Sequence, residues 1–208
     1  MEFTAGTTTR RRVLLGIGAT GMVALAGCTG STSDGAENVP VLGNENADVT
    51  LEVYEDMGCP ACGEYVQNSF DNIRSQYVDT NQIRYEHRDL MSTSQGPLAA
   101  NAAREVFERH GNDAFWEFKS EIFADQGGFR NSPTSTIEAI SDDLGFETQA
   151  ILDAVDDQTH SDAIDADESR ASSLGANTTP SFVVNESLAG RGAGSVPEVV
   201  QELDAELQ

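Results

Sequence analysis

Two cysteines separated by two residues, Cys59 and Cys62, are the side chains of this chain best suited to chemistry. They directly follow a strand-like run at residues 49–54. A cysteine pair with this spacing, at the turn from a strand to a helix, is typical of a redox-active dithiol. The helix predicted to begin there has an apolar stripe formed by Cys62, Val66, Phe70, Ile73 and Tyr77. We therefore expect Cys59 at the N-terminal edge of the helix and Cys62 facing inward.

This placement favours a thiolate at Cys59. Unpaired backbone N–H groups and the positive end of the helix dipole stabilise an anion at the first turn. A pKa below the free thiol value of about 8.5 makes Cys59 both reactive and a good leaving group, as disulfide transfer requires. Cys62, one turn further on and less accessible, is expected to be the resolving thiol.

Two other interpretations of the cysteine pair remain open. Half of a zinc site needs two further ligands, and the other candidates are Cys28 and three scattered histidines, at positions 87, 110 and 160. A structural disulfide between Cys59 and Cys62 closes so small a loop that it removes little chain entropy. We expect no metal and no separate cofactor, because the Cys59–Cys62 disulfide is itself the redox group.

The N-terminus predicts export. Three arginines, Arg10, Arg11 and Arg12, precede an apolar run at residues 13–26 that ends before Cys28. Twin arginines indicate the Tat route, and the run is short compared with the roughly 20 residues of a spanning helix. Residues 1–27 are thus predicted to be a lipoprotein signal peptide, with Cys28 as the lipid-modified first residue on the outer face of the cytoplasmic membrane. An uncleaved anchor and soluble secretion are the alternatives.

The charge of the chain is strongly negative. Lys and Arg number 12 against 35 acidic residues, a formal net charge of −23, and Lys119 is the single lysine. Such self-repulsion is screened at molar salt, where the Debye length is about 3 Å, so the composition is typical of an extreme halophile's protein. It argues against nucleic-acid binding and against electrostatic attachment to anionic lipid. Membrane attachment would then depend on the lipid on Cys28.

The remaining chain divides into a linker and one domain. Residues 28–47 are rich in Gly, Ser, Thr, Asn and acidic residues, which predicts a flexible tether. Residues 48–208 have the size of a single domain with a proper core. A second strand is predicted at 82–90, a block of helices at about 97–174, a third strand at 181–184, a glycine-rich turn and a closing helix. This order is that of an α/β thioredoxin fold with an inserted helical domain.

Several motifs of the domain resemble the DsbA-like family of exported thiol-disulfide oxidoreductases. They are residues 49–62, the strand ending in Arg88-Asp89-Leu90, the helix with Phe115-Trp116-Glu117 and the Thr-Thr-Pro-Ser-Phe-Val-Val-Asn sequence at 178–185. The resemblance implies that Pro180 is the family's cis-proline beside the dithiol. It also implies that the backbone of Thr179 pairs with an extended substrate segment as an added β-strand.

The chain departs from the family pattern at two places. The buried carboxylate usually found six residues before the first cysteine is replaced by Val53. By the strand period of two, Glu55 projects to the same side as Val53 and can stand in for it, or it is an ordinary loop carboxylate. Between the cysteines, Pro60-Ala61 lacks the histidine of the most oxidising members, so their extreme thiolate stabilisation is not expected here.

The predicted function is formation of disulfides in exported proteins that carry free thiols, followed by reoxidation of the enzyme by a membrane partner. The same atoms also serve an isomerase or a reductase. A tethered chaperone or metal carrier is the alternative from a different class of protein, and only the enzyme hypotheses require both cysteines.

Overall fold

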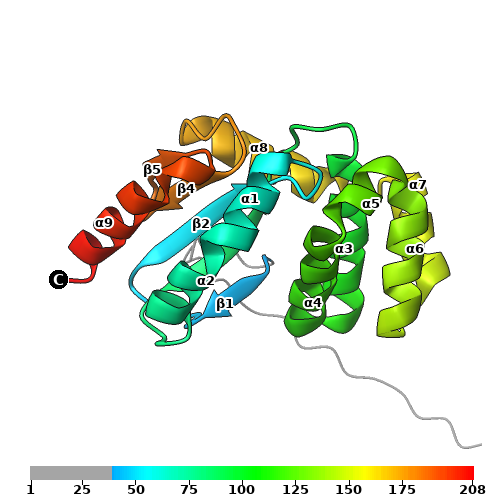
Figure 1. The fold of residues 1–208 in the computed structure, drawn as a ribbon, viewed down its shortest axis with the longest axis horizontal. Helices are drawn as coiled ribbons and strands as arrows, with labels where there is room; N and C mark the ends of the chain where they lie inside the picture. The colour runs from blue at the N-terminus through cyan, green and yellow to red at the C-terminus, as the bar shows by residue number, and fades with distance from the viewer. Residues whose placement is uncertain (1–38) are drawn as a thin grey trace, which may run out of the picture. The chain divides into compact units, whose positions relative to one another are not determined.

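The computed structural model describes residues 39–208, which contain a five-stranded sheet with the order β1-β3-β2-β4-β5 (Figure 1). The strands are β1 Val41–Gly43, β2 Thr50–Glu55, β3 Arg84–Asp89, β4 Ser181–Val184 and β5 Ser187–Arg191. β2 and β3 are parallel, and the other neighbours are antiparallel. The central strands β2 and β3 are buried over nearly their whole length because helices cover both faces of the sheet.

One face of the sheet is covered by the helical segment that begins directly after Cys59 and by the last helix. The first consists of α1 Pro60–Asn68, α2 Phe70–Ile73 and the π-helical η2 Arg74–Val78, and the last is α9 Val196–Glu206, after the short 3-10 turn η3 Ala193–Ser195. Apolar residues of these helices pack on Leu51, Val53 and Phe182 of the sheet. The sequence predicted a single helix, whereas the chain breaks at Ser69. The predicted apolar stripe survives the break, since Ile73 and Tyr77 remain in the core.

Helices fill the interval between β3 and β4, and all but the last of them form a group beside the sheet in Figure 1. They are α3 Gly96–His110, α4 Asn112–Ala124, α5 Gln126–Asn131, α6 Pro133–Leu144, α7 Thr148–Asp157 and α8 Ser161–Ser173. Phe115, Phe118 and Ile122 of α4 are the centre of their apolar core, and both cysteines belong to that core. α8 instead lies on the second face of the sheet, where Ala171 packs with Tyr54. The dithiol therefore lies where the helical insertion meets the sheet.

The predicted end of the tether is wrong. Residues 39–47 belong to the domain, because Val41–Gly43 pair with β3 as an edge strand and Val39 and Val41 are buried. The side chain of Asn112 at the start of α4 accepts from the N–H of Val41 and donates to its carbonyl, both at 2.8 Å. A three-residue strand is too short to show a period, and the proline before it and the Gly43-Asn44 at its end are typical of a linker.

The predicted fold class, an α/β thioredoxin fold with an inserted helical domain, is confirmed. The signal peptide at 1–27, Cys28 and residues 29–38 of the tether lie outside the described residues. Within 39–208, no helix has both the length and the apolar character that a membrane crossing requires.

Candidate active site

Cys59 occupies the position just before the first turn of α1, where its backbone is extended. Its N–H donates to the carbonyl of Asp56, and its own carbonyl accepts from the N–H groups of Cys62 and Gly63, both at 3.1 Å. Pro60 opens the helix, as suits a residue without an N–H to satisfy. Cys59 is 9% exposed and Cys62 is fully buried, and both are free thiols. The predicted asymmetry between an outer and an inner cysteine is thus present.

The two thiols differ strongly in acidity. The pKa of Cys59 is lowered to about 5, chiefly by a hydrogen bond from the Cys62 thiol, with further hydrogen bonds from Thr179 and from the N–H groups of Cys62 and Ala61 outweighing burial. Burial raises the pKa of Cys62, and so do the hydrogen bond to Cys59 and the charge of Glu55. Cys59 is therefore a thiolate at neutral pH and Cys62 a thiol. The hydrogen bond between the cysteines is the largest cause of the low pKa of Cys59. The sequence had predicted this low pKa from the helix dipole and the backbone N–H groups alone.

The loop before β4 lies against Cys59. The peptide bond between Thr179 and Pro180 is cis, as the family resemblance implied. The Sγ of Cys59 is 3.7 Å from the carbonyl oxygen of Thr179. Ala61, which is half-buried, brings no polar side chain to the thiolate. The cysteine turn and the loop with Pro180 come from distant parts of the chain, and the β2–β4 pairing brings them together.

Glu55 ends β2 and is completely buried. One carboxylate oxygen, Oε2, forms an ion pair with the ammonium of Lys119 and lies 3.2 Å from Nδ1 of His87. Burial alone raises the pKa of Glu55, but Lys119 and His87 outweigh it and hold the pKa below its usual value. The other oxygen, Oε1, is the one buried side-chain oxygen or nitrogen of residues 39–208 without a hydrogen-bond partner. Glu55 is thus a strand-end carboxylate with a free acceptor, close enough to Cys62 to raise its pKa.

Lys119 and His87 were not predicted as parts of the site. Lys119 comes from α4 of the helical insertion and His87 from β3, so both reach Glu55 only in the folded chain. One signal was available in the sequence, since Lys119 is the single lysine of 208 residues. A single lysine in so acidic a chain is not needed for solubility. Its side chain is only 5% exposed, and a buried ammonium requires a charged partner such as Glu55.

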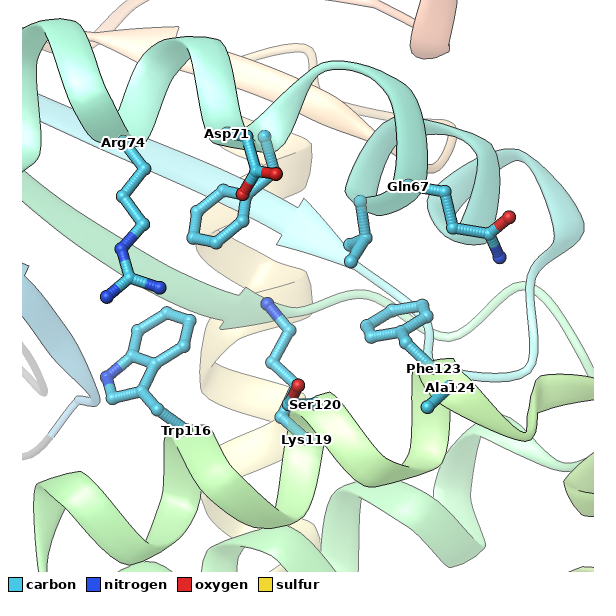
Figure 2. A pocket seen from close by; sticks show the side chains of 10 residues that line it. Gln67, Asp71, Arg74, Trp116, Lys119, Ser120, Phe123 and Ala124 are labelled. Carbon is cyan, nitrogen blue, oxygen red and sulfur yellow. The ribbon is translucent and has the colours of Figure 1, made fainter.

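Lys119 also borders a cavity of about 490 Å³ between α4 and the α1–η2 segment. Figure 2 shows its side chain rising from α4 between Trp116 and Phe123. The ammonium lies 4.8 Å from the centre of the Trp116 ring, a favourable cation–π distance. The indole N–H of Trp116 donates to the carbonyl of Val41 at 3.2 Å, which ties the wall of this cavity to β1. Trp116 is therefore a structural residue between the two cores.

Gln126 connects the helical insertion to the cysteine turn. Its side-chain amide, at the start of α5, donates to the carbonyls of Met57 and Cys59, both at 2.9 Å. The absence of a side chain at Gly63 makes room for it, because a Cβ there would lie 2.4 Å from the Gln126 amide oxygen. This contact holds the backbone that presents Cys59.

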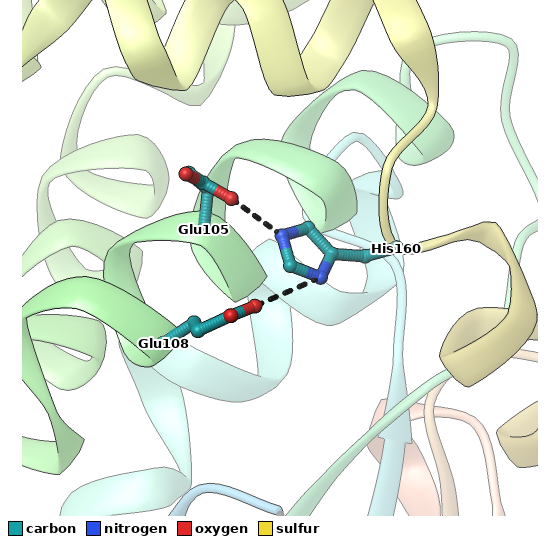
Figure 3. A group of neighbouring side chains, drawn as sticks. All are labelled: Glu105, Glu108 and His160. Atoms are coloured by element: carbon teal, nitrogen blue, oxygen red, sulfur yellow. Dashed lines mark hydrogen bonds and ion pairs between the residues drawn. The ribbon is translucent and has the colours of Figure 1, made fainter.

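A second cluster of titratable residues lies away from the cysteines, where Glu105 and Glu108 of α3 flank His160 (Figure 3). The Nε2 of His160 is 2.8 Å from Glu105, and its Nδ1 is 3.9 Å from Glu108. Arg109 also pairs with Glu105. The two ring nitrogens thus face different carboxylates and do not converge on one point. We assign this cluster the structural role of fastening α8 to α3.

A third polar group is buried behind the sheet. Arg88 of β3 pairs with Glu86 at 2.6 Å and with Asp167 at 3.0 Å, while Arg104 of α3 pairs with Asp89 and Asp167. All five side chains are less than one-tenth exposed. Buried charges persist only when they are paired, so this network fixes α3 and α8 to the strand that carries His87.

Comparison with known proteins agrees with the geometry. A thioredoxin family model matches residues 36–195. Disulfide bond formation protein D of Bacillus subtilis is 22% identical over 173 residues, which are 81% of this chain and 77% of that protein.

Solved structures show the same fold. Oxidised BdbD from Bacillus subtilis superimposes with a TM-score of 0.73 at 21% identity, over 82% of this chain and 93% of that one. α-DsbA1 from Wolbachia pipientis does so with a TM-score of 0.69 at 20% identity, over the same shares of the two chains. With its cysteine pair at the start of α1, the chain belongs to the thioredoxin family and is a thiol-disulfide oxidoreductase whose fold is similar to that of DsbA structures.

Proposed function

We propose that this protein is an exported oxidase that introduces disulfides into other exported proteins. The observation that carries the proposal is the difference in acidity between the cysteines. A dithiol in which Cys59 is a stabilised thiolate, with a pKa of about 5, is favoured over its disulfide. The oxidised form therefore tends to accept electrons from the thiols of a client protein.

The reaction proceeds through a mixed disulfide. A client thiolate attacks the Sγ of Cys59 in the oxidised enzyme, the Cys59–Cys62 bond breaks, and Cys62 leaves with the electron pair and takes up a proton. A second client thiolate then attacks the client sulfur of the mixed disulfide and releases Cys59 as a thiolate. The client loses two electrons and gains a disulfide, and the enzyme is left as the dithiol.

Reoxidation uses the same sulfurs in the opposite order. The Cys59 thiolate attacks a disulfide of a membrane partner, and Cys62 must then lose its proton to displace that partner. Glu55 is the base that we assign to this step, because its Oε1 is buried and unpaired and its charge acts on Cys62. Lys119 and His87 hold its other oxygen in place. Glu55→Gln is expected to slow release of the partner by about 10²-fold, and an unchanged rate would remove this role.

Client recognition is proposed to depend on the backbone beside Pro180. Thr179 lies next to Cys59, and an extended client segment can pair with its peptide groups as an added strand. Pairing through the backbone reads little of the client's side chains, which suits an enzyme with many clients. The strongly acidic composition argues against nucleic acid as a partner.

The reduction potential tests the direction of the reaction. Equilibration with glutathione in high salt should give a reduction potential between about −270 mV and about −120 mV, the values of thioredoxin and of the strongest oxidant of this type. The absence of a histidine at Ala61 places it below the upper value. A potential at or below about −270 mV would overturn the oxidase proposal in favour of a reductase.

Trapping tests the roles of the cysteines. Cys62→Ser should accumulate mixed disulfides between Cys59 and exported proteins, and Cys59→Ser should trap none. The opposite result would exchange the two roles. A protein that keeps its cellular function with both cysteines replaced by serine is a chaperone or carrier, contrary to the proposal.

Export and attachment rest on the sequence of the first 28 residues. We propose Tat export, cleavage before Cys28 and lipid attachment at that cysteine, which would hold the domain on the outer face of the cytoplasmic membrane. The intact mass of the protein from the membrane fraction should lack residues 1–27. Cys28→Ser should release or stall the protein, and a membrane-bound form that retains residues 1–27 would contradict cleavage.

A further inference from the structure

Asp56, the residue that follows β2, carries a buried carboxylate that joins two loops. It is 1% exposed. One oxygen accepts from the N–H of Gly58 at 2.7 Å and from the hydroxyl of Thr93 at 3.1 Å. The other accepts from the N–H groups of Ser92 and Thr93, at 2.8 and 2.6 Å, and the Ser92 hydroxyl lies 3.1 Å from it. A carboxylate with this many donors fixes the geometry of both loops.

Two glycines leave room for this arrangement. A Cβ at Gly58 would lie 2.5 Å from the hydroxyl of Thr93, and a Cβ at Gly96 would lie 2.7 Å from the Asp56 carboxylate. Neither position has space for any other residue unless the cluster moves. The close approach of the two loops to Asp56 therefore requires a glycine in each of them.

The cluster extends to the loop that contains Pro180. The hydroxyls of Ser92 and Thr179 are 2.7 Å apart. In the reduced enzyme the Thr179 hydroxyl donates its one proton to the Cys59 thiolate, so in its pair with Ser92 the Ser92 hydroxyl donates and Thr179 accepts, while the N–H of Ser92 keeps the link to Asp56. A chain of hydrogen bonds thus runs from Thr179 through Ser92 to Asp56.

Both ends of this chain touch Cys59. The carbonyl of Asp56 accepts the N–H of Cys59 at 2.9 Å. At the other end, the carbonyl of Thr179 is 3.7 Å from the Cys59 sulfur. The three segments that surround the thiol, namely the cysteine turn, the loop at 91–95 and the loop at 178–180, are therefore linked through one carboxylate.

We propose that Asp56 and Ser92 are positioning residues of the dithiol, which set the place of Thr179 against Cys59 and so tune how far the enzyme favours its reduced form. This inference rests on the proposed thiol-disulfide chemistry and adds two residues to it. Thr179 is among the groups that lower the pKa of Cys59. Loosening Thr179 therefore weakens the thiolate and makes the enzyme a weaker oxidant.

Ser92→Ala is the sharpest variant because Ser92 is exposed, so its loss does not open the core. It should raise the pH midpoint of the Cys59 thiolate absorbance and shift the equilibrium with glutathione by about fivefold toward the disulfide form of the enzyme, the effect of one neutral hydrogen bond. Ser92→Thr, which keeps the hydroxyl, should restore both values. Ser94→Ala is the matched control, since Ser94 is exposed in the same loop and bonds only to Gln95.

Thr179→Val, which removes the hydroxyl at nearly the same shape, tests the path. The double variant Ser92→Ala/Thr179→Val should have the same thiolate midpoint and the same glutathione equilibrium as Thr179→Val alone, because each substitution breaks the same chain of hydrogen bonds. Additive effects, or wild-type values in Ser92→Ala, would overturn the proposal. Asp56→Asn should shift both readouts in the same direction. A wild-type potential in the reductase range would defeat the oxidase function but leave these shifts measurable, so the two ideas fail separately.

Discussion

At the scale of single residues, the chemistry depends on one pair of sulfurs that differ in exposure and charge. Cys59 is a partly accessible thiolate and Cys62 a buried thiol that donates to it. Their difference arises from the turn into α1, and Glu55 adds to it by its charge.

The thiolate of Cys59 should titrate with a midpoint at about pH 5 in the reduced protein. The ultraviolet absorbance of the thiolate measures this transition. The rate at which Cys59 is alkylated should fall in parallel below that pH. Cys59→Ser is the control and should abolish the transition. A midpoint close to the ordinary thiol value would show that Cys62 and the backbone N–H groups do not stabilise the anion.

The same lowered pKa makes the stability of the reduced form depend on pH. Because the pKa of Cys59 is lower in the folded state than its ordinary value of 9.0, the thiolate stabilises the folded protein fully above pH 9 and no longer does so below about pH 5. The raised pKa of Cys62 destabilises the reduced form only above that ordinary value. Between pH 5 and 9, the free energy of unfolding of the reduced form should therefore rise relative to the oxidised form. A constant difference in urea melts would contradict this.

Removing one partner of the Glu55–Lys119 pair should be costly. Lys119→Met leaves a buried carboxylate without its cation and should lower the free energy of unfolding by about 3–5 kcal/mol. The double variant with Glu55→Gln should recover most of that loss, because neither position then carries a charge. Denaturant unfolding of Lys119→Met, Glu55→Gln and the double variant, each compared with wild type, measures the energy of the pair. Equal stabilities of Lys119→Met and wild type would mean that water replaces the ammonium.

At the scale of elements, the site depends on contacts between segments that are distant in the sequence. β2 and β4 bring the cysteine turn to Thr179, α4 supplies Lys119, and α5 supplies Gln126. β1, the shortest strand, closes the edge of the sheet beside β3. Its attachment to α4 brings residues 39–47 into the domain.

Asn112→Ala should loosen β1. It removes the two 2.8 Å hydrogen bonds to the backbone of Val41 and should cost about 1–3 kcal/mol of the free energy of unfolding. Amide hydrogen exchange at residues 41–43 should accelerate, while exchange at β2 should change little. Asn131→Ala, at an exposed asparagine whose amide bonds only within α5, is the control. Unchanged exchange at β1 would show that the strand is held by β3 alone.

At the scale of the whole molecule, the charge decides the conditions under which the fold is stable. The few cations of residues 39–208 are largely taken up by buried or local ion pairs, so most acidic side chains repel each other without compensation. This repulsion acts on the folded, compact state more than on the unfolded chain. Salt is therefore expected to be a requirement for folding.

The thermal midpoint should rise steeply between about 0.1 M and about 3 M KCl, as the Debye length falls from about 10 Å to below 3 Å. Circular dichroism at both concentrations measures this directly. A protein of the same fold and near-neutral charge is the control for general salting effects. Equal midpoints at the two concentrations would remove the halophile interpretation.

The sequence by itself determined the cysteine pair, its place at a strand-to-helix turn and the order of most elements. These are local or periodic features, and local propensities and spacing carry them. The place of Pro180 beside the dithiol came instead from the resemblance to the DsbA-like family. The tertiary structure alone decided that Glu55 is paired with Lys119, that Asp56 joins the loops around Cys59, and that Val41 belongs to the sheet. Each of these depends on which distant segments meet. Only packing settles that, because a side chain's burial and charge partners come from elements separated by tens of residues.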